Sequence, residues 1–286
     1  MSWVLQLFNG LAMSALLFLL ASGLTLAFGL MRVVNLAHGA FYLLGGYIGV
    51  SVVRATGSFW LAILAGGVGV AVLGYVSERT VFRKIGEHEL RQVLMTLGLA
   101  YVIGDLTLAY WGGGVLSVSP PQWLTGSMPI FDWFAYPRYR VFLIVAGTLM
   151  ALALWLLQER TSIGVSIRAG VDDRDMAAAM GVNVRSLFTA VFVFAALIAG
   201  MTGVLGGGFL RVFPGADWEV LVLALVVIIV GGLGSLKGAM IGALFVGIVD
   251  TYGRWLVPEL AFAMVFAPMA ILLAVRPQGL FGKEYV

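Results

Sequence analysis

Charge and cysteine are the two features that this sequence most lacks. Only 11% of its 286 residues are Asp, Glu, Lys or Arg, whereas 61% are hydrophobic, and soluble domains typically carry about 25% charged residues. Water cannot solvate a surface so poor in charge, and the mean hydropathy of +1.03 indicates a lipid bilayer instead. The absence of cysteine excludes disulfides and thiolate metal sites.

Patterns for catalysis, metal binding and nucleotide binding are also missing. Two histidines, His38 and His88, leave little scope for a His-based metal centre. The glycine-rich segment near 231–238 fits neither the P-loop nor the dinucleotide-binding pattern, because Lys237 stands at the wrong position for both. The net charge of +3 is thinly spread, without the basic cluster that nucleic acid requires. We therefore expect no enzyme activity, no metal and no nucleic acid partner.

Long apolar runs dominate what is present. A helix needs about 20 apolar residues to cross the hydrocarbon core, and only helices pair every backbone amide within such a run. The sequence thus predicts an all-α integral membrane protein, a polytopic bundle that forms one domain over residues 1–286. Eight or nine spans are expected, since the seventh and eighth form either two crossings or one re-entrant pair. The candidate spans are 10–30, 36–53, 58–80, 92–111, 139–157, 187–206, 219–233, 238–255 and 258–275.

Basic residues mark one side of the membrane. They occur in the loops at 79–91 and 158–185 and in the C-terminal tail, whereas the loop at 112–137 has neither Lys nor Arg. The positive-inside rule places the first three in the cytoplasm and the 112–137 loop outside. The first apolar run lacks the basic n-region of a secretory signal, so we expect a retained span. With nine spans the N-terminus is also outside.

Two short segments suggest an internal repeat. "GLMRV" at 29–33 and "GFLRV" at 208–212 share Gly, Arg and Val at equal spacing, each at the end of an apolar span. The predicted orientation puts Arg32 inside and Arg211 outside, as inverted-topology repeats require. A match of this length also arises by chance in a chain rich in Gly and Val, so both interpretations stay open.

The longest charged stretch is "SIRAGVDDRDMAAAMGVNVRSLF" at 166–188. Asp172 and Asp173 suit a helix N-cap, and Gly181 suits the position after a helix C-terminus, so we expect a helix of about two turns between them. A helix this short is not stable alone. It either packs on the protein's own bundle or docks on a cytoplasmic partner.

Polar residues and regular glycines stand out within the apolar spans. Unpaired polar groups at membrane depth are costly, so these side chains either satisfy one another structurally or face a translocation path. A pairing of Asp105 or Asp250 with Arg32 or Arg211 would be structural. The candidate path residues are Asn35, His38, Gly39, Tyr42 and Asp105. Glycines four residues apart indicate close helix packing, with a hinge as the weaker alternative: Gly234, Gly238 and Gly242.

Three segments, at 23–47, 168–184 and 230–250, together resemble the membrane permeases of branched-chain amino acid ABC importers (LivH type). The resemblance runs in order over nearly the whole chain. It departs at Lys237, where the family more usually has Pro or a small residue. The resemblance makes the loop at 168–184 the ATPase-contacting loop. Its implied coupling residues are Arg168, Asp172, Asp175, Met176, Ala177, Ala178, Met180 and Gly181.

The resemblance also implies a setting. The chain would be a multi-pass permease subunit of a bacterial inner membrane, half of a path for amino acids, most often branched-chain. Its implied partners are a second, related but non-identical permease, two cytoplasmic ABC ATPases that hold the ATP and Mg, and a periplasmic substrate-binding protein. Related permeases carry urea, short amides or aromatic acids. The alternative class is an ion-coupled secondary carrier or channel, with Asp105, Asp250 and His38 as coupling sites.

Overall fold

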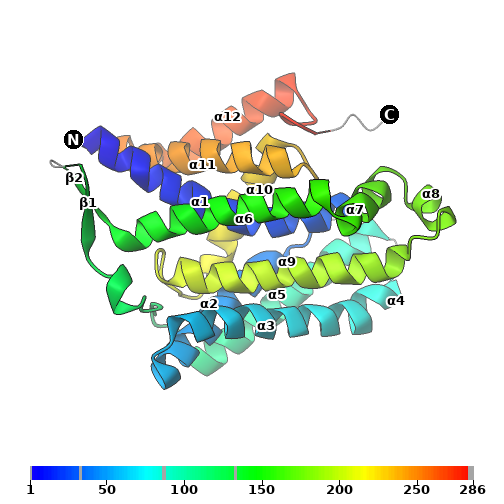
Figure 1. The fold of residues 1–286 in the computed structure, drawn as a ribbon, viewed down its shortest axis with the longest axis horizontal. Coiled ribbons are helices and arrows are strands. Elements are labelled where there is room, and N and C mark those ends of the chain that lie inside the picture. Colours follow the sequence, from blue (N-terminus) through cyan, green and yellow to red (C-terminus); the bar gives the residue numbers. More distant parts are fainter. Residues whose placement is uncertain (1, 32–33, 86–87, 132–133, 283–286) are drawn as a thin grey trace.

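The computed structural model describes residues 2–31, 34–85, 88–131 and 134–282. Its ribbon is an elongated bundle of helices with a small hairpin at one end and a short helix, α8, projecting at the other (Figure 1). We call these the hairpin end and the α8 end. The longer helices are α1 Ser2–Met31, α2 Ala37–Thr56, α3 Phe59–Ser77, α5 Glu89–Trp111, α6 Arg138–Arg160, α9 Val184–Gly207, α10 Ala216–Gly231, α11 Leu236–Leu256 and α12 Ala261–Val275.

Short elements join these helices. A π-helical turn at Glu78–Phe82 extends α3 and leads into α4 (Arg83–Ile85), and a 3-10 turn at Pro258–Leu260 precedes α12. A further 3-10 turn, Gln122–Leu124, precedes strands β1 (Ser127–Phe131) and β2 (Phe134–Pro137), which pair antiparallel. Two helices, α7 (Ser162–Asp172) and α8 (Arg174–Ala179), lie between α6 and α9.

Seven helices of the described chain are long and apolar enough to cross a membrane. The two predicted spans outside this set are α2, which holds several glycines and polar residues, and α10, with only 16 residues. The expected count of eight or nine crossings is therefore not confirmed by length and composition. The all-α expectation is also wrong in one detail, because the loop at 112–137 contains the β1–β2 hairpin. That hairpin lies at the end of the bundle, where water can solvate its edges (Figure 1).

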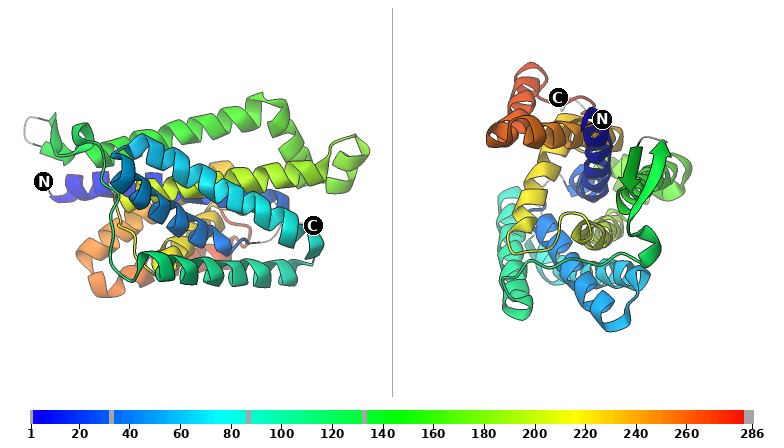
Figure 2. Two further views of the ribbon diagram at one scale, coloured as in Figure 1. Left: turned by 90° about the horizontal axis from the view of Figure 1, so that it is seen from below. Right: turned by 90° about the vertical axis from the view of Figure 1, so that its left-hand side faces the viewer.

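The bundle has a buried centre and an apolar outer surface. Four-fifths of the most apolar window of α1 is buried, whereas α5, α6 and α12 bury less than a quarter of theirs. Exposed leucines on these outer helices include Leu94, Leu106 and Leu149. Soluble proteins rarely expose apolar surface of this extent. The apolar outer surface fits contact with lipid or with other membrane subunits. The end view shows α1 and α9 enclosed by the other helices (Figure 2).

Glycines allow the central helices to approach closely. A β-carbon on Gly203 of α9 would overlap the carbonyl oxygen of Tyr42, and one on Gly45 would overlap the backbone of Gly200. The glycines of α2 therefore lie within a continuous helix and do not interrupt it. Small residues serve helix packing in membranes because dispersion contacts replace the hydrophobic effect there.

The glycines at 234, 238 and 242 occupy two different environments. β-Carbons on Gly238 and Gly242 of α11 would overlap the carbonyl oxygens of Gly231 and Val227 in α10. The two helices therefore cross in direct backbone contact. Gly234 lies in the intervening turn with φ +78°, a conformation that other residues rarely adopt.

Two helix pairs, α1–α2 and α9–α10, share one architecture. In each pair a long helix ends, and a second helix begins inside the bundle after non-helical residues, 34–36 before α2 and 208–215 before α10. The first turns of α2 and α10 meet, since a β-carbon on Gly39 would overlap the carbonyl oxygen of Asp217. The described part of "GLMRV", residues 29–31, ends α1, whereas "GFLRV" at 208–212 directly follows α9. Arg32 and Val33 lie outside the described residues, so the predicted side of Arg32 is not tested.

Candidate functional site

Helix α8 at the end of the bundle is formed by local capping. The side chain of Asp173 accepts a hydrogen bond from the amide of Met176 at 2.9 Å. At the other end Gly181 has φ +87°, and the amide of Val182 donates to the carbonyl of Ala177 at 3.0 Å. The predicted helix is present, although its six residues make it shorter than two turns. Asp173, not Asp172, is the cap.

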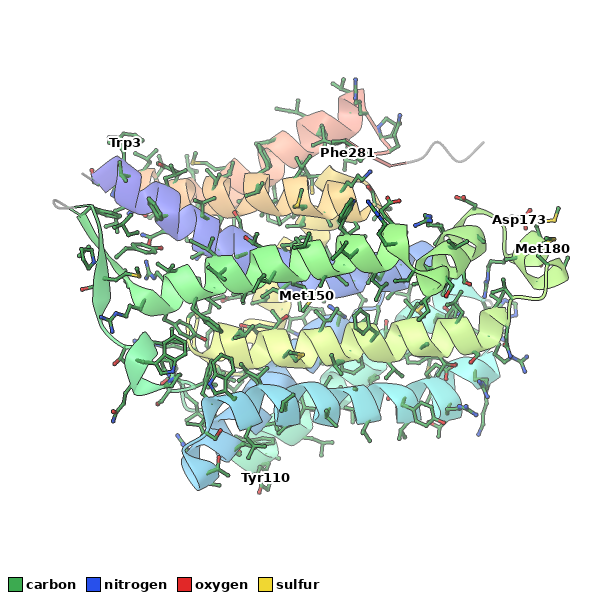
Figure 3. All side chains as sticks on the ribbon, viewed as in Figure 1. Trp3, Tyr110, Met150, Asp173, Met180 and Phe281 are labelled. Atoms are coloured by element: carbon green, nitrogen blue, oxygen red, sulfur yellow. The ribbon has the colours of Figure 1, made fainter. Side chains whose placement is uncertain are left out.

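The surface of α8 is largely open to solvent. Only Ala177 is buried, at 4% exposure, whereas Met176 and Met180 are 61% and 78% exposed (Figure 3). Ala178 and Asp175 are exposed as well. Met180 lies just beyond the last helical residue, whereas Met176 lies within the helix. Two exposed methionines form an adaptable apolar surface on a helix that has its polar ends satisfied.

Arg168 belongs to α7, apart from the exposed face of α8. Its guanidinium lies 3.8 Å from the carboxylate of Glu159 at the end of α6. Lys237 at the start of α11 approaches the same carboxylate at 4.0 Å. Glu159 thus links α6, α7 and α11 at the α8 end, although exposed pairs of this kind contribute little stability.

The candidate path residues Asn35 and His38 have different surroundings. Asn35 precedes α2, and its side-chain oxygen accepts from the amide of Ala37 at 3.1 Å. Nε2 of His38 lies 3.0 Å from the carbonyl oxygen of Leu20 in α1, and the imidazole is fully buried. The two residues therefore do not share a helical face, because α2 begins only at Ala37.

Within the described residues neither Asp105 nor Asp250 pairs with Arg211, and the pairing considered with Arg32 lies outside those residues. Asp250 of α11 accepts from Nε of Arg254 at 2.9 and 3.0 Å, not from Arg211. No ion pair of Asp105 is found within the described chain, and its carboxylate is exposed on the outer helix α5. It borders a cavity of about 180 Å³ together with Tyr101, Asp217 and Trp218.

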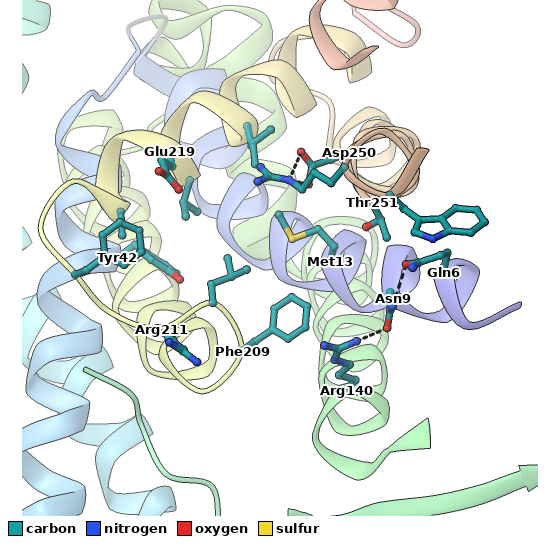
Figure 4. Close-up of a pocket in the computed structure, with 17 residues that line it drawn as sticks. Gln6, Asn9, Met13, Tyr42, Arg140, Phe209, Arg211, Glu219, Asp250 and Thr251 are labelled. Carbon is teal, nitrogen blue, oxygen red and sulfur yellow. Dashed lines mark hydrogen bonds and ion pairs between the residues drawn. The ribbon is translucent and has the colours of Figure 1, made fainter. Parts of the chain in front are cut away.

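A larger cavity, of about 550 Å³, opens between α1, α2, α6, α10, α11 and the 208–215 connection (Figure 4). Its size lies within the range of small-molecule sites, about 300–1,000 Å³. We call it the hairpin-end cavity, because it lies beside the first turns of α1 and α6. Its lining residues are Gln6, Asn9, Met13, Tyr42, Arg140, Phe209, Leu210, Arg211, Phe213, Ala216, Glu219, Val220, Leu223, Asp250, Thr251, Arg254 and Trp255.

The hairpin-end cavity brings together five charged groups from four segments. Arg254 pairs with Asp250 inside α11. Arg140 donates to the side-chain oxygen of Asn9 and lies 5.3 Å from the ring centre of Phe209. Arg211 and Glu219 complete the set. Of the sequence-predicted path residues, Tyr42 alone lines this cavity.

Sequence reasoning did not assign Arg140, Glu219 or Arg254 to a site. Each lies near the end of an apolar run, where charged residues are ordinary. The one available signal was the segment "RVFPGADWE" at 211–219, which carries three charges between two apolar helices. Its proximity to α1, α6 and α11 depends on tertiary packing.

These features define the class: a multi-pass membrane protein with a polar cavity at one end of its helix bundle and a capped, exposed helix at the other. Residues 6–275 match the model of the family described as branched-chain amino acid transport system / permease component, and the chain belongs to this family. The family is a transport component, not an enzyme.

Individual relatives agree over nearly the full length. The chain is 28% identical to the high-affinity branched-chain amino acid transport system permease protein LivH of Salmonella typhimurium, covering 98% of this chain and 96% of that protein. It is 29% identical to LivH of Escherichia coli K12, with the same coverage. A solved structure described as a metal-chelate type ABC transporter in an inward-facing conformation shares the fold, with TM-score 0.50 at 20% identity, covering 96% of this chain and 85% of that one.

Proposed function

We propose that this chain is the permease subunit of an ABC importer for branched-chain amino acids and forms half of the translocation path. The observation that carries the proposal is the family match over 6–275, and the LivH relatives support the substrate class. The ion-coupled carrier or channel is not favoured, because the match covers nearly the whole chain. Urea, short amides and aromatic acids are not favoured as substrates for the same reason.

The proposed orientation puts the α8 end in the cytoplasm of a bacterial inner membrane and the hairpin end outside. Support comes from the loop charges, since the basic 158–185 segment lies at the α8 end and the uncharged hairpin loop lies at the other. If α2 and α10 count as crossings, nine spans result and the N-terminus is external. The matching breaks after α1 and α9 support an inverted repeat.

The proposed path runs beside α5, where this subunit meets a second, related permease. A carboxylate cannot face hydrocarbon without a cost of several kcal/mol, yet Asp105 is exposed among apolar neighbours on α5. A polar path between two subunits would solvate it. Asn35, His38 and Gly39 stabilise the helices around that path, because they fix the start of α2 against α1 and α10.

The proposed power source is a pair of cytoplasmic ATPases, which bind the ATP and Mg and dock on α8. A periplasmic binding protein delivers the substrate to the hairpin end. Support for docking comes from the exposure of Met176, Ala178 and Met180 on a helix with both ends capped. Such a helix transmits force because its backbone is already ordered before the partner binds.

The test is Ala178→Arg in the assembled importer. Ala178 is exposed, so the fold accepts an arginine, whereas a docked ATPase would meet an extra charge and a longer side chain. We expect transport-coupled ATP hydrolysis to fall at least tenfold while membrane insertion stays normal. The matched control is Ala55→Arg, at an exposed position of the opposite end, which should keep full coupling. Normal coupling in the Ala178→Arg importer would remove the docking assignment.

A further inference from the structure

The hairpin-end cavity contains a polar group that the fold leaves unsatisfied. Tyr42 is 2% exposed, and its hydroxyl has no hydrogen-bond partner among the described residues. The hydroxyl points toward the middle of the cavity (Figure 4). A buried hydroxyl without a partner costs about 1–3 kcal/mol, so its retention indicates that something else occupies the cavity and accepts or donates a hydrogen bond there.

Two opposite charges line the cavity on the same side as Tyr42. Arg211 and Glu219 are exposed to it, and within the described chain neither side chain has an ion pair or hydrogen bond. Arg254 forms an ion pair with Asp250, and Arg140 donates a hydrogen bond to the neutral amide of Asn9. Figure 4 shows Glu219, Tyr42 and Arg211 across the cavity from Arg140 and Asn9. The groups of the described cavity lining that have neither a hydrogen bond nor an ion pair therefore include one cation, Arg211, one carboxylate, Glu219, and the hydroxyl of Tyr42.

Arg211 is held in an unusual backbone conformation. It is the only non-glycine residue of the described chain with positive φ, at 73°, which is disfavoured for a long side chain. The next residue, Val212, exchanges two backbone hydrogen bonds of 2.8 Å with Leu116. This bridge fixes the connection between α9 and α10, and with it the position from which Arg211 reaches the cavity. Strained residues of this kind cluster at ligand sites.

We propose that the hairpin-end cavity binds one free α-amino acid as its zwitterion, within a single permease subunit. Arg211 receives the α-carboxylate, Tyr42 donates a hydrogen bond to the same carboxylate, and Glu219 receives the α-ammonium group. The apolar side chain then packs against Met13, Phe209 and Leu223. The choice of an amino acid rests on the proposed function, whereas the need for two opposite charges on one ligand comes from the cavity itself. This site is separate from the Asp105 path on α5.

The experiment uses the full chain in lipid nanodiscs, without ATPases or binding protein, and radiolabelled L-leucine as the probe. We expect saturable binding that unlabelled leucine displaces. Leucine methyl ester, which lacks the carboxylate charge, and N-acetyl-leucine, which lacks the ammonium charge, should each compete at least tenfold more weakly, because each leaves one protein charge unpaired. Inorganic phosphate and acetate should not compete.

Three variants assign the contacts. Arg211→Gln and Glu219→Gln should each weaken leucine binding about tenfold or more, and Tyr42→Phe, which keeps the ring, about threefold or more. The matched controls are Arg276→Gln and Glu259→Gln, at positions outside the cavity, which should bind leucine as the unchanged chain does. Size-exclusion profiles of all five variants report whether the fold is kept.

Several results would overturn the proposal. The first is the absence of saturable leucine binding, and the second is competition by leucine methyl ester and N-acetyl-leucine as strong as that by leucine. The others are displacement by phosphate or acetate as strong as that by leucine, and unchanged leucine binding in folded Arg211→Gln and Glu219→Gln chains. Phosphate displacement would assign the cavity to a simple anion or a lipid headgroup instead. An importer that still transports branched-chain amino acids despite such a result keeps the proposed function and loses only this site.

Discussion

At the scale of single residues, His38 and Tyr42 are two buried polar side chains of α2 with different surroundings. The two lie one helical turn apart on α2, and both side chains are buried. His38 reaches a carbonyl oxygen of α1 at 3.0 Å, whereas the Tyr42 hydroxyl meets only the cavity. Burying a polar group costs free energy in both cases. A hydrogen bond to α1 offsets this cost at His38, whereas the Tyr42 hydroxyl has no partner among the described residues.

Gly203 provides a residue-scale prediction. A β-carbon there would overlap the Tyr42 carbonyl oxygen, whereas one on Gly98 of α5 meets nothing within 4 Å. We expect Gly203→Ala to destabilise the chain by about 1–3 kcal/mol, because α2 and α9 must move apart. Gly98→Ala should be neutral or stabilising by up to about 1 kcal/mol, since alanine favours the helix. Thermal unfolding in detergent measures both, and equal stability of the two variants would contradict the close packing.

At the scale of elements, α8 depends on its caps more than on its sequence length. Six residues cannot sustain a helix without help. Packing contributes through buried Ala177 and through Arg174, whose guanidinium lies 5.7 Å from the ring centre of Phe188. The carboxylate of Asp173 and the turn at Gly181 supply the remaining order. The surface that we assign to the ATPases is thus ordered by residues that the ATPase need not touch.

Asp173 provides the element-scale prediction. Asp173→Ala removes the N-cap and should cost α8 about 1 kcal/mol, enough to lower transport-coupled ATP hydrolysis severalfold. Asp173→Asn should restore most of the coupling, because asparagine caps a helix as well as aspartate does. Coupled ATPase activity in the assembled importer is the measurement. Equal losses in both variants would show that the charge of Asp173 matters and not the cap.

At the scale of the whole molecule, the two ends of the bundle differ in charge and in construction. The α8 end carries the basic loops and a salt-bridged junction of α6, α7 and α11 around Glu159. The hairpin end carries the uncharged loop, the β-hairpin and the hairpin-end cavity. This asymmetry underlies the proposed sidedness of the chain in the membrane.

The absence of cysteine makes that sidedness directly testable. Ser127→Cys at the hairpin end and Ala179→Cys at the α8 end both replace exposed residues. We expect a membrane-impermeant maleimide to label the first variant in intact spheroplasts and the second only after permeabilisation. The unchanged chain is the control, because it has no thiol. The reverse labelling pattern would invert the assignment of the two ends.

The sequence by itself determined the membrane class, most helix boundaries and the capped α8, because hydropathy, loop charge and capping act over one helix or one turn. It also carried the motifs of the permease family. Tertiary structure alone decided that His38 reaches the carbonyl oxygen of Leu20 in α1, and that Tyr42, Arg211 and Glu219 share one cavity. These groups come from separate segments of the chain, and only the close packing that the glycines permit brings them together.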